Sequence, residues 1–139
     1  MDTVAEPVLL KKGAEASLYV ADWHGRRVVI KVRIPKRYRP EELDKQIRSY
    51  RTVHEPQLMH EAKAAGVPTP LIYMVNVPEA SITMEFIEGE NLGLAIKRIA
   101  AALAGEDTKA DLANVVKAGE LLAKVHSCNM TLGDTKPEN

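Results

Sequence analysis

The chain of 139 residues lacks most of the features that mark secreted, membrane and metal-cluster proteins. Its one cysteine, Cys128, excludes an internal disulfide and a cysteine-cluster metal site. No run of about 18 apolar residues occurs, so no transmembrane helix is expected. The opening residues, MDTVAEPVLLKKG, are acidic and lack the apolar segment of a secretory signal. These absences favour a cytoplasmic protein that does not enter a membrane.

Aromatic residues are also scarce. The chain has four Tyr, one Trp and one Phe, so aliphatic side chains must form most of the core. Hydrophobic residues make up 45% of the chain and charged residues 27%, which is typical of a globular protein with a modest core. The length suits one domain, or one small lobe with part of another.

A net charge is absent too, but the charges are unevenly distributed. Residues 26–51 hold ten Lys and Arg against three acidic residues, so this segment carries +7 and the remainder −7. A basic strip of this kind can bind phosphate or RNA. It can equally form a solvated face that the acidic half offsets. The composition leaves both interpretations open.

The apolar pattern indicates strands, a helix, further strands and then helices, which is an α+β order. The second and third strands are separated only by a His-Gly turn, which predicts an antiparallel hairpin. Strands are expected near residues 8–12, 17–23, 26–34, 71–77 and 81–87.

The first helical pattern covers residues 41–65 and stops at Gly66. Pro56 interrupts it, and a proline inside a helix removes a hydrogen bond at a cost on the order of 3 kcal/mol. We therefore expect either two helices or one kinked helix, with the break near residues 54–56.

Two more helices are expected towards the C-terminus. LGLAIKRIAAALAG should end at Gly105, and KADLANVVKAGELLAKVH should be capped by Asp107 or Thr108.

A short loop and a lysine carry the first chemical signal. Gly13 lies in the loop KGAEAS between two strands, and Lys31 lies in VVIKV on the third strand. Backbone amides of such a loop can cover phosphates while the lysine pairs with them. The alternatives are an ordinary hairpin turn and an edge-strand lysine that prevents aggregation. Glu15 would repel phosphate in this loop unless a cation intervened.

A lysine that binds phosphates needs an acid to hold its side chain in place. Glu55 and Glu61 are the candidates on the helical segment. Pro56 disfavours helical geometry at Glu55, whereas Glu61 lies within the following turns. The sequence leaves the choice between them open.

The last residues, TLGDTKPEN, contain the spacing D-x(4)-N from Asp134 to Asn139. This spacing can place a carboxylate beside a nucleophile and an amide oxygen on a metal, although it also occurs by chance. Upstream, MEFIEGENL follows an apolar strand and reads either as a linker between two lobes or as a plain strand exit. The backbone of a linker could pair with the edge of an adenine.

The order of G-A-E-A, V-I-K, R-T-V-H-E, M-E-F-I-E-G and G-D-x-K-P-E-N resembles the small atypical protein kinase/ATPase subunit of the KEOPS complex, archaeal type. The resemblance extends from about Leu9 to Asn139. It implies a protein-kinase-like α+β fold, in which a five-stranded antiparallel sheet carries a long or broken helix of the αC type. The N-lobe and hinge would take residues 1–88, and residues 89–139 would begin a helical C-lobe that ends at the catalytic loop.

The resemblance also implies ATP and Mg²⁺ as cofactors and assigns a role to particular residues. Lys31 would bind the phosphates and pair with Glu55, and Met84 would be the gatekeeper beside the adenine. The implied ATP-binding residues are Gly13, Ala14, Glu15, Ala16, Lys31, Glu55, Met84, Glu85, Phe86 and Ile87.

The implied catalytic residues lie in the last segment. Asp134 would orient or deprotonate the attacking hydroxyl or water, Lys136 would neutralise the transferred phosphate, and Asn139 would bind Mg²⁺. Leu132 stands where the family usually has His, a position that mainly braces the loop. The second Mg²⁺-binding Asp, in a D-x-G, is not in this sequence. We therefore expect a kinase cut after its catalytic loop, inactive as the 139-residue chain alone.

The implied activity is phosphoryl transfer to Ser or Thr, or slow ATP hydrolysis, in support of tRNA threonylcarbamoyladenosine formation. The implied partners are other KEOPS subunits, chiefly the tRNA threonylcarbamoyltransferase subunit, and tRNA. Two alternatives remain open: a non-catalytic scaffold that binds nucleotide or partners, and another small atypical kinase of the RIO or aminoglycoside-phosphotransferase type.

Overall fold

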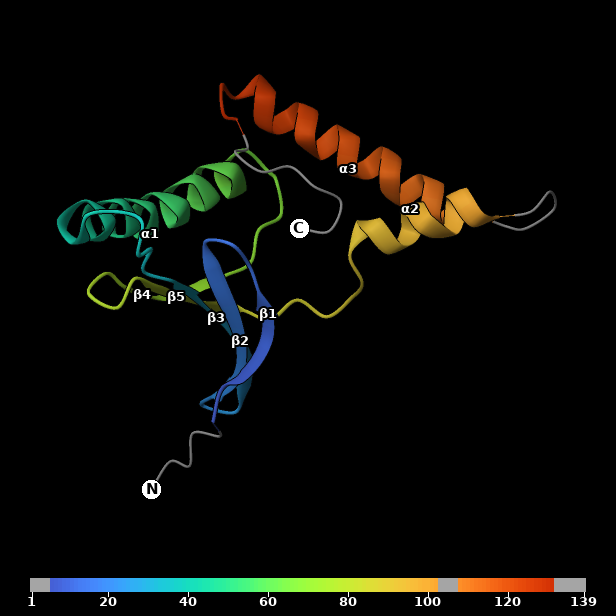
Figure 1. Ribbon diagram of the computed structural model, residues 1–139. Helices are drawn as coiled ribbons and strands as arrows, with labels where there is room; N and C mark the ends of the chain where they lie inside the picture. Colours follow the sequence, from blue (N-terminus) through green and yellow to red (C-terminus); the bar gives the residue numbers. More distant parts are fainter. Residues whose placement is uncertain (1–5, 103–107, 132–139) are drawn as a thin grey trace. The chain divides into compact units, whose positions relative to one another are not determined.

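The computed structural model describes residues 6–102 and 108–131, and the chain divides into two compact units (Figure 1). The first unit takes in Met1–Glu61 and Pro68–Ile87, and the second takes in Ala62–Val67 and Glu88–Asn139. Each unit is described by itself.

The first unit contains the predicted five-stranded antiparallel sheet. Its strand order is β1-β2-β3-β5-β4, and every neighbouring pair is antiparallel. The observed bounds lie within two residues of the predicted ones. The strands are β1 (Val8–Lys12), β2 (Ala16–Trp23), β3 (Arg26–Arg33), β4 (Ile72–Asn76) and β5 (Ser81–Glu85).

The turn between β2 and β3 confirms the predicted hairpin. His24 and Gly25 both have positive φ, 52° and 73°, as a two-residue turn requires if it is to match the twist of the strands. Asp22 steadies the turn, because its carboxylate accepts a hydrogen bond of 3.0 Å from the Gly25 N–H.

The core of the sheet lies where β3 and β5 meet. Val28 on β3 is fully buried and Ile82 on β5 is 1% exposed. Ser81 and Thr83 are buried as well, so β5 is covered on both faces. Its backbone also pairs with β3 on one side and with β4 on the other, so its hydrogen-bonding groups are satisfied within the sheet.

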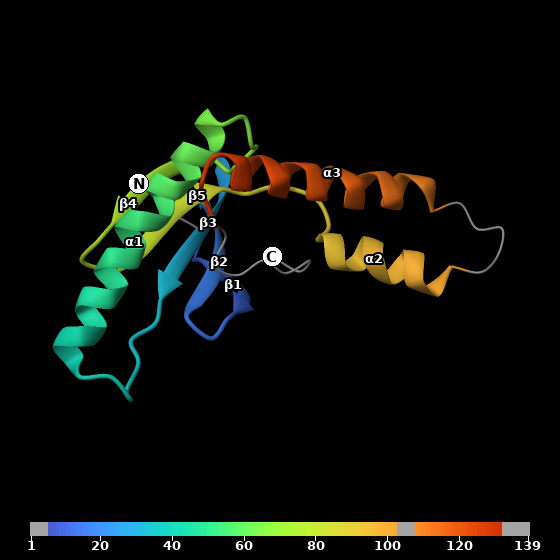
Figure 2. The same cartoon turned by 90° about the horizontal axis from the view of Figure 1, so that it is seen from above.

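One helix, α1 (Glu41–Ala64), follows the sheet's first three strands and contains Pro56. It is drawn as one coiled ribbon in Figure 2, so the alternative of two separate helices is wrong. A proline removes only its own N–H from the hydrogen-bond ladder, and the turns on both sides keep theirs. The fully buried Thr52 lies one turn earlier and donates from Oγ1 to the Arg48 carbonyl at 2.7 Å.

The end of α1 confirms the predicted stop at Gly66. Gly66 has φ +84°, and its N–H donates to the Lys63 carbonyl at 2.9 Å. The next N–H, of Val67, reaches back to the Ala62 carbonyl at 2.9 Å. These two bonds form a Schellman motif, which satisfies the last carbonyls of a helix through a residue in the left-handed conformation.

The second unit contains α2 (Leu92–Ala101) and α3 (Lys109–Ser127). Asn91 caps α2, because its side chain accepts a hydrogen bond of 3.1 Å from the Leu94 N–H. Thr108 is the N-cap residue of α3, but its side chain makes no capping hydrogen bond. The other predicted boundary residues, Gly105 and Asp107, lie outside the described residues.

Arg98 joins α2 to α3. Its guanidinium donates to both carboxylate oxygens of Asp111, at 2.9 and 2.6 Å, and also contacts the carboxylate of Glu90. The two acids stabilise the protonated guanidinium and raise the pKa of Arg98, Asp111 more than Glu90. Within the described part of the chain, no helix is long and apolar enough to cross a membrane.

Candidate functional site

The loop between β1 and β2 is a tight turn that depends on glycine. The Gly13 N–H donates to the Ala16 carbonyl at 2.8 Å. A Cβ at Gly13 would lie 2.9 Å from that carbonyl oxygen, closer than real Cβ atoms approach backbone. The one glycine of the loop is therefore at the position where a side chain does not fit.

Lys31 and Glu55 meet between the sheet and the helix. The Lys31 Nζ on β3 lies 2.7 Å from Glu55 Oε1 on α1, and each side chain is 26% exposed. The restriction that Pro56 places on Glu55 does not prevent the pair, because α1 stays helical through both residues. Glu61, the other candidate, lines a separate pocket with Pro56 and His60.

Arg33 binds the same carboxylate from the other side. Its Nη2 donates to Glu55 Oε2 and, at 3.3 Å, to the Arg51 carbonyl. Lys31 and Arg33 are two residues apart on β3, so their side chains lie on one face of the sheet. Two cations therefore hold Glu55 in one orientation. Sequence reasoning missed Arg33, although this spacing of two in VVIKVRI was a usable signal.

Burial also affects Arg33. Its side chain is 11% exposed, and this burial lowers its pKa, while the nearby charge of Glu55 opposes the shift. The Nε atom is buried and has no hydrogen-bond partner within the part of the chain that the structure describes. A buried cation of this kind is strongly dependent on its acid, because losing Glu55 would leave the charge unpaired.

Cations surround Glu15, the acid that was unexpected in a phosphate loop. Glu15 Oε1 lies 3.3 Å from Arg39 Nη2, and Oε2 lies 3.1 Å from Arg51 Nη1. The Lys36 ammonium donates to the Ala14 carbonyl in the same loop. The connector before α1 and α1 itself therefore both bind the loop, and they offset the charge of its carboxylate.

The basic strip at residues 26–51 is thus largely engaged inside the molecule. At least six of its ten cations form ion pairs with acidic side chains, so the strip is not a free polycation. These six are Lys31, Arg33, Arg39, Lys45, Arg48 and Arg51.

The segment expected to contact adenine follows β5. The backbone N–H of Glu85 donates to the Leu71 carbonyl at 2.8 Å, and Glu85 Oε2 accepts from the Leu71 N–H at 3.0 Å. The Glu85 N–H is therefore not available to a nucleotide. Met84 and Phe86 are half-buried, the guanidinium of Arg27 lies 5.2 Å from the Phe86 ring centre, and Ile87 is exposed.

The three residues of the catalytic segment, Asp134, Lys136 and Asn139, lie outside the described residues, as does Leu132. Among the residues that are described, no group of three or more His, Cys, Asp or Glu side chains could hold a metal ion. The described part does fit a nucleotide's phosphates in its donor set, because it joins a glycine turn to a lysine held by an acid.

Comparison with known proteins places these features in context. No family model matches the chain. It is 39% identical over 132 residues to the "Probable bifunctional tRNA threonylcarbamoyladenosine biosynthesis protein" of Methanosarcina mazei, covering 94% of this chain and 21% of that protein. It is 34% identical over 137 residues to the "KEOPS complex subunit Bud32" of Pyrococcus abyssi, covering 94% of this chain and 59% of that subunit.

A third relative is the "Probable serine/threonine-protein kinase BUD32 homolog" of Archaeoglobus fulgidus, 37% identical over 127 residues. The match covers 91% of this chain and 55% of that protein. The chain therefore spans about a fifth of the bifunctional relative and less than two thirds of the shorter ones.

Among solved structures, the chain resembles the Rio2 kinase of Chaetomium thermophilum in its ADP/Mg²⁺-phosphoaspartate complex, with a TM-score of 0.54 and 16% identity. The match covers 70% of this chain and 34% of that kinase, and at this identity it shows the fold alone. The chain is thus protein-kinase-like in fold, and over most of its length it is homologous to the Bud32 subunits and bifunctional proteins of tRNA threonylcarbamoyladenosine biosynthesis, as its motifs predicted.

Proposed function

We propose that the chain carries the nucleotide-binding part of an ATP-dependent atypical Ser/Thr protein kinase/ATPase, the KEOPS subunit that supports threonylcarbamoyladenosine formation in tRNA. The observation that carries the proposal is the pair of Lys31 and Glu55, 2.7 Å apart, on a kinase-like fold. The similarity to Bud32 subunits over 94% of the chain supports this assignment over a RIO-type kinase, for which only the fold is similar.

Different segments of the described chain would bind the phosphates and the adenine of ATP. The backbone of the loop from Gly13 to Ala16 covers the phosphates, and Lys31 neutralises part of their charge while Glu55 fixes the position of its ammonium. Met84 and the backbone of residues 85–87, apart from the Glu85 N–H, would contact the adenine. ATP with Mg²⁺ supplies the phosphoryl group and neutralises its charge.

The remaining roles belong to the last segment. Asp134 would orient or deprotonate the attacking hydroxyl or water, Lys136 would neutralise the transferred phosphoryl group, and Asn139 would hold Mg²⁺. We also propose that residues 1–88 act as the N-lobe and hinge and residues 89–139 as part of the C-lobe. The partners are other KEOPS subunits, chiefly the tRNA threonylcarbamoyltransferase subunit, together with tRNA, in the cytoplasm.

The test is phosphoryl transfer in the full-length protein that carries this chain. Lys31→Ala should lower both autophosphorylation and ATP hydrolysis by about a hundredfold or more, because it removes a positioned charge from the phosphate site. Radiolabelled ATP and a phosphate-release assay measure the two activities.

Lys97→Ala provides the matched control, because Lys97 is an exposed lysine on α2. Its activity should equal that of the unsubstituted protein. Unchanged activity in Lys31→Ala would overturn the proposed mechanism. Tight ATP binding without turnover in the unsubstituted protein would instead support a nucleotide-binding scaffold.

A further inference from the structure

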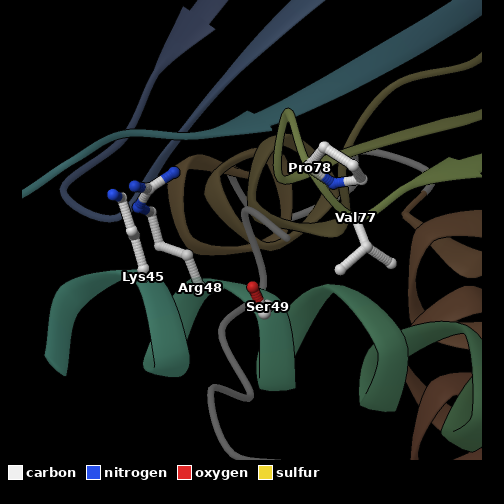
Figure 3. A pocket seen from close by; sticks show the side chains of 5 residues that line it. All are labelled: Lys45, Arg48, Ser49, Val77 and Pro78. Carbon is white, nitrogen blue, oxygen red and sulfur yellow. The ribbon is translucent and has the colours of Figure 1, made fainter. Parts of the chain in front are cut away.

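A pocket of about 290 Å³ lies between α1 and the turn that joins β4 to β5 (Figure 3). Lys45, Arg48 and Ser49 of α1 line one side, and Val77 and Pro78 of the turn line the other. All five residues belong to the first unit. None of them takes part in the proposed nucleotide site.

The two basic side chains of the pocket point the same way. Lys45 and Arg48 are three residues apart on α1, and Ser49 is four residues from Lys45, so all three share a face of the helix. Figure 3 shows the nitrogen ends of Lys45 and Arg48 side by side, with the Ser49 hydroxyl beyond them and the Val77 and Pro78 side chains opposite.

Asp44 fixes the position of the Arg48 side chain and leaves its terminal nitrogens available to an anion. Its Nε donates to Asp44 Oδ2 at 2.7 Å, and this hydrogen bond lowers the pKa of Asp44 and keeps it ionised. Asp44 is only 3% exposed and also accepts from the Lys36 N–H at 3.1 Å, so the anchor itself is fixed. The terminal nitrogens of Arg48, Nη1 and Nη2, donate to none of the residues that the structure describes.

Lys45 can turn to a ligand at little cost. Its ammonium lies 3.0 Å from Glu41 Oε1, but the two side chains are 59% and 84% exposed. An exposed ion pair of this kind contributes little to stability, so an anion in the pocket can replace Glu41.

The donor set selects a compact dianion. An ammonium, two free guanidinium nitrogens and a hydroxyl match the three terminal oxygens of a phosphomonoester. Glu41, Glu42 and Glu79 are exposed at the ends of the two elements that line the pocket, and their charges would repel an extended polyanion such as RNA. Val77 and Pro78 offer an apolar wall to whatever carries the phosphate. We propose that this pocket binds a phosphorylated Ser or Thr side chain presented by a protein segment.

The binding test uses a fluorescent heptapeptide whose only charged side chain is a central phosphoserine, titrated with the full-length protein and followed by fluorescence anisotropy. Lys45→Gln should weaken binding roughly tenfold, because it removes one charge-assisted hydrogen bond. Ser49→Ala should weaken it less, because the hydroxyl is a neutral donor. Neither substitution removes a buried ion pair, so both variants should melt as the unsubstituted protein does.

Lys117→Gln is the matched control, because Lys117 is an exposed helical lysine, 67% exposed, paired with a glutamate. It should bind the phosphopeptide unchanged. Equal binding of the unphosphorylated peptide, or undiminished binding by Lys45→Gln, would overturn the proposal. Inorganic phosphate or a single-stranded RNA decamer that displaced the peptide at a lower concentration than unlabelled phosphopeptide would also overturn it. Phosphopeptide binding should not depend on the nucleotide site, because the two sites share no residue. A Lys31→Ala protein should therefore bind the phosphopeptide as the unsubstituted protein does.

Discussion

At the scale of single residues, Glu55 connects the sheet to the helix. It accepts from Lys31 at 2.7 Å and from the mostly buried Arg33, so one carboxylate offsets two cations. In a kinase-like site, the position of the lysine decides how well the phosphates are bound. The orientation of Glu55 therefore bears on both nucleotide binding and the stability of the first unit.

Substitution of Glu55 by Gln tests this role. The amide keeps the size of the side chain but leaves Lys31 and Arg33 without their anion, so the KM for ATP should rise roughly tenfold and Tm should fall. Glu61→Gln is the matched control, because Glu61 is on the same helix but does not contact Lys31. Steady-state ATP hydrolysis and thermal melting of the full-length protein measure the two effects. If Glu61→Gln caused the larger loss, the assignment of Glu55 would be wrong.

At the scale of elements, α2 and α3 are joined by a charged contact. Hydrogen bonds from Arg98 lower the pKa of both Asp111 and Glu90 below the usual carboxyl range. A carboxyl group with a lowered pKa in the folded state contributes stability above its unfolded pKa and loses it as the pH falls through the folded value. The contact should therefore be intact at neutral pH.

We expect the pairing of α2 and α3 to weaken as the pH falls below about 4, the unperturbed carboxyl range. Hydrogen exchange of the backbone amides in both helices, measured from pH 7 to pH 3, should show protection lost below that range. The variant Arg98→Gln should show weaker protection at neutral pH and a smaller change on acidification. Equal pH profiles in the two proteins would exclude this ion pair as the cause.

At the scale of the whole molecule, apolar side chains remain exposed on both units. On β1, Val8, Leu9 and Leu10 are 68%, 52% and 55% exposed, and on α3, Leu112 and Val116 are 49% and 62% exposed. β1 is also an edge strand of the sheet, which offers unpaired backbone groups to another chain. Exposed apolar surface of this extent favours association unless a partner covers it.

The isolated 139-residue chain should therefore self-associate as its concentration rises. Gel filtration with light scattering should show a mass above 15.3 kDa, and Val116→Lys should reduce it by placing a charge in the apolar stretch of α3. The exposed Asn114→Lys is the control, because Asn114 lies on α3 two residues from both Leu112 and Val116 and so does not share their face of the helix. A monomer with a single cooperative melt at all concentrations would contradict the expectation.

The sequence by itself determined the elements and pointed to Gly13 and Lys31 as candidates for the site. Short apolar runs, the His-Gly turn and the stop at Gly66 indicated where strands and the first helix begin and end, because these signals act over a few neighbouring residues. Gly13 could be chosen from its place in the loop between the first two strands, and Lys31 from its place on the third. The order β1-β2-β3-β5-β4 was not predicted, because strand pairing depends on contacts distant in sequence.

Only the tertiary structure decided between Glu55 and Glu61, and it alone brought Arg33 to Glu55 and both Arg39 and Arg51 to Glu15. Local rules placed a break at Pro56 and so weakened the case for Glu55, yet the turns on either side of the proline keep α1 helical. Ion pairs such as Glu15 with Arg51 join residues 36 positions apart. Such pairs form only when the sheet and α1 pack together. A local sequence pattern therefore cannot predict which side chains the packing brings into contact.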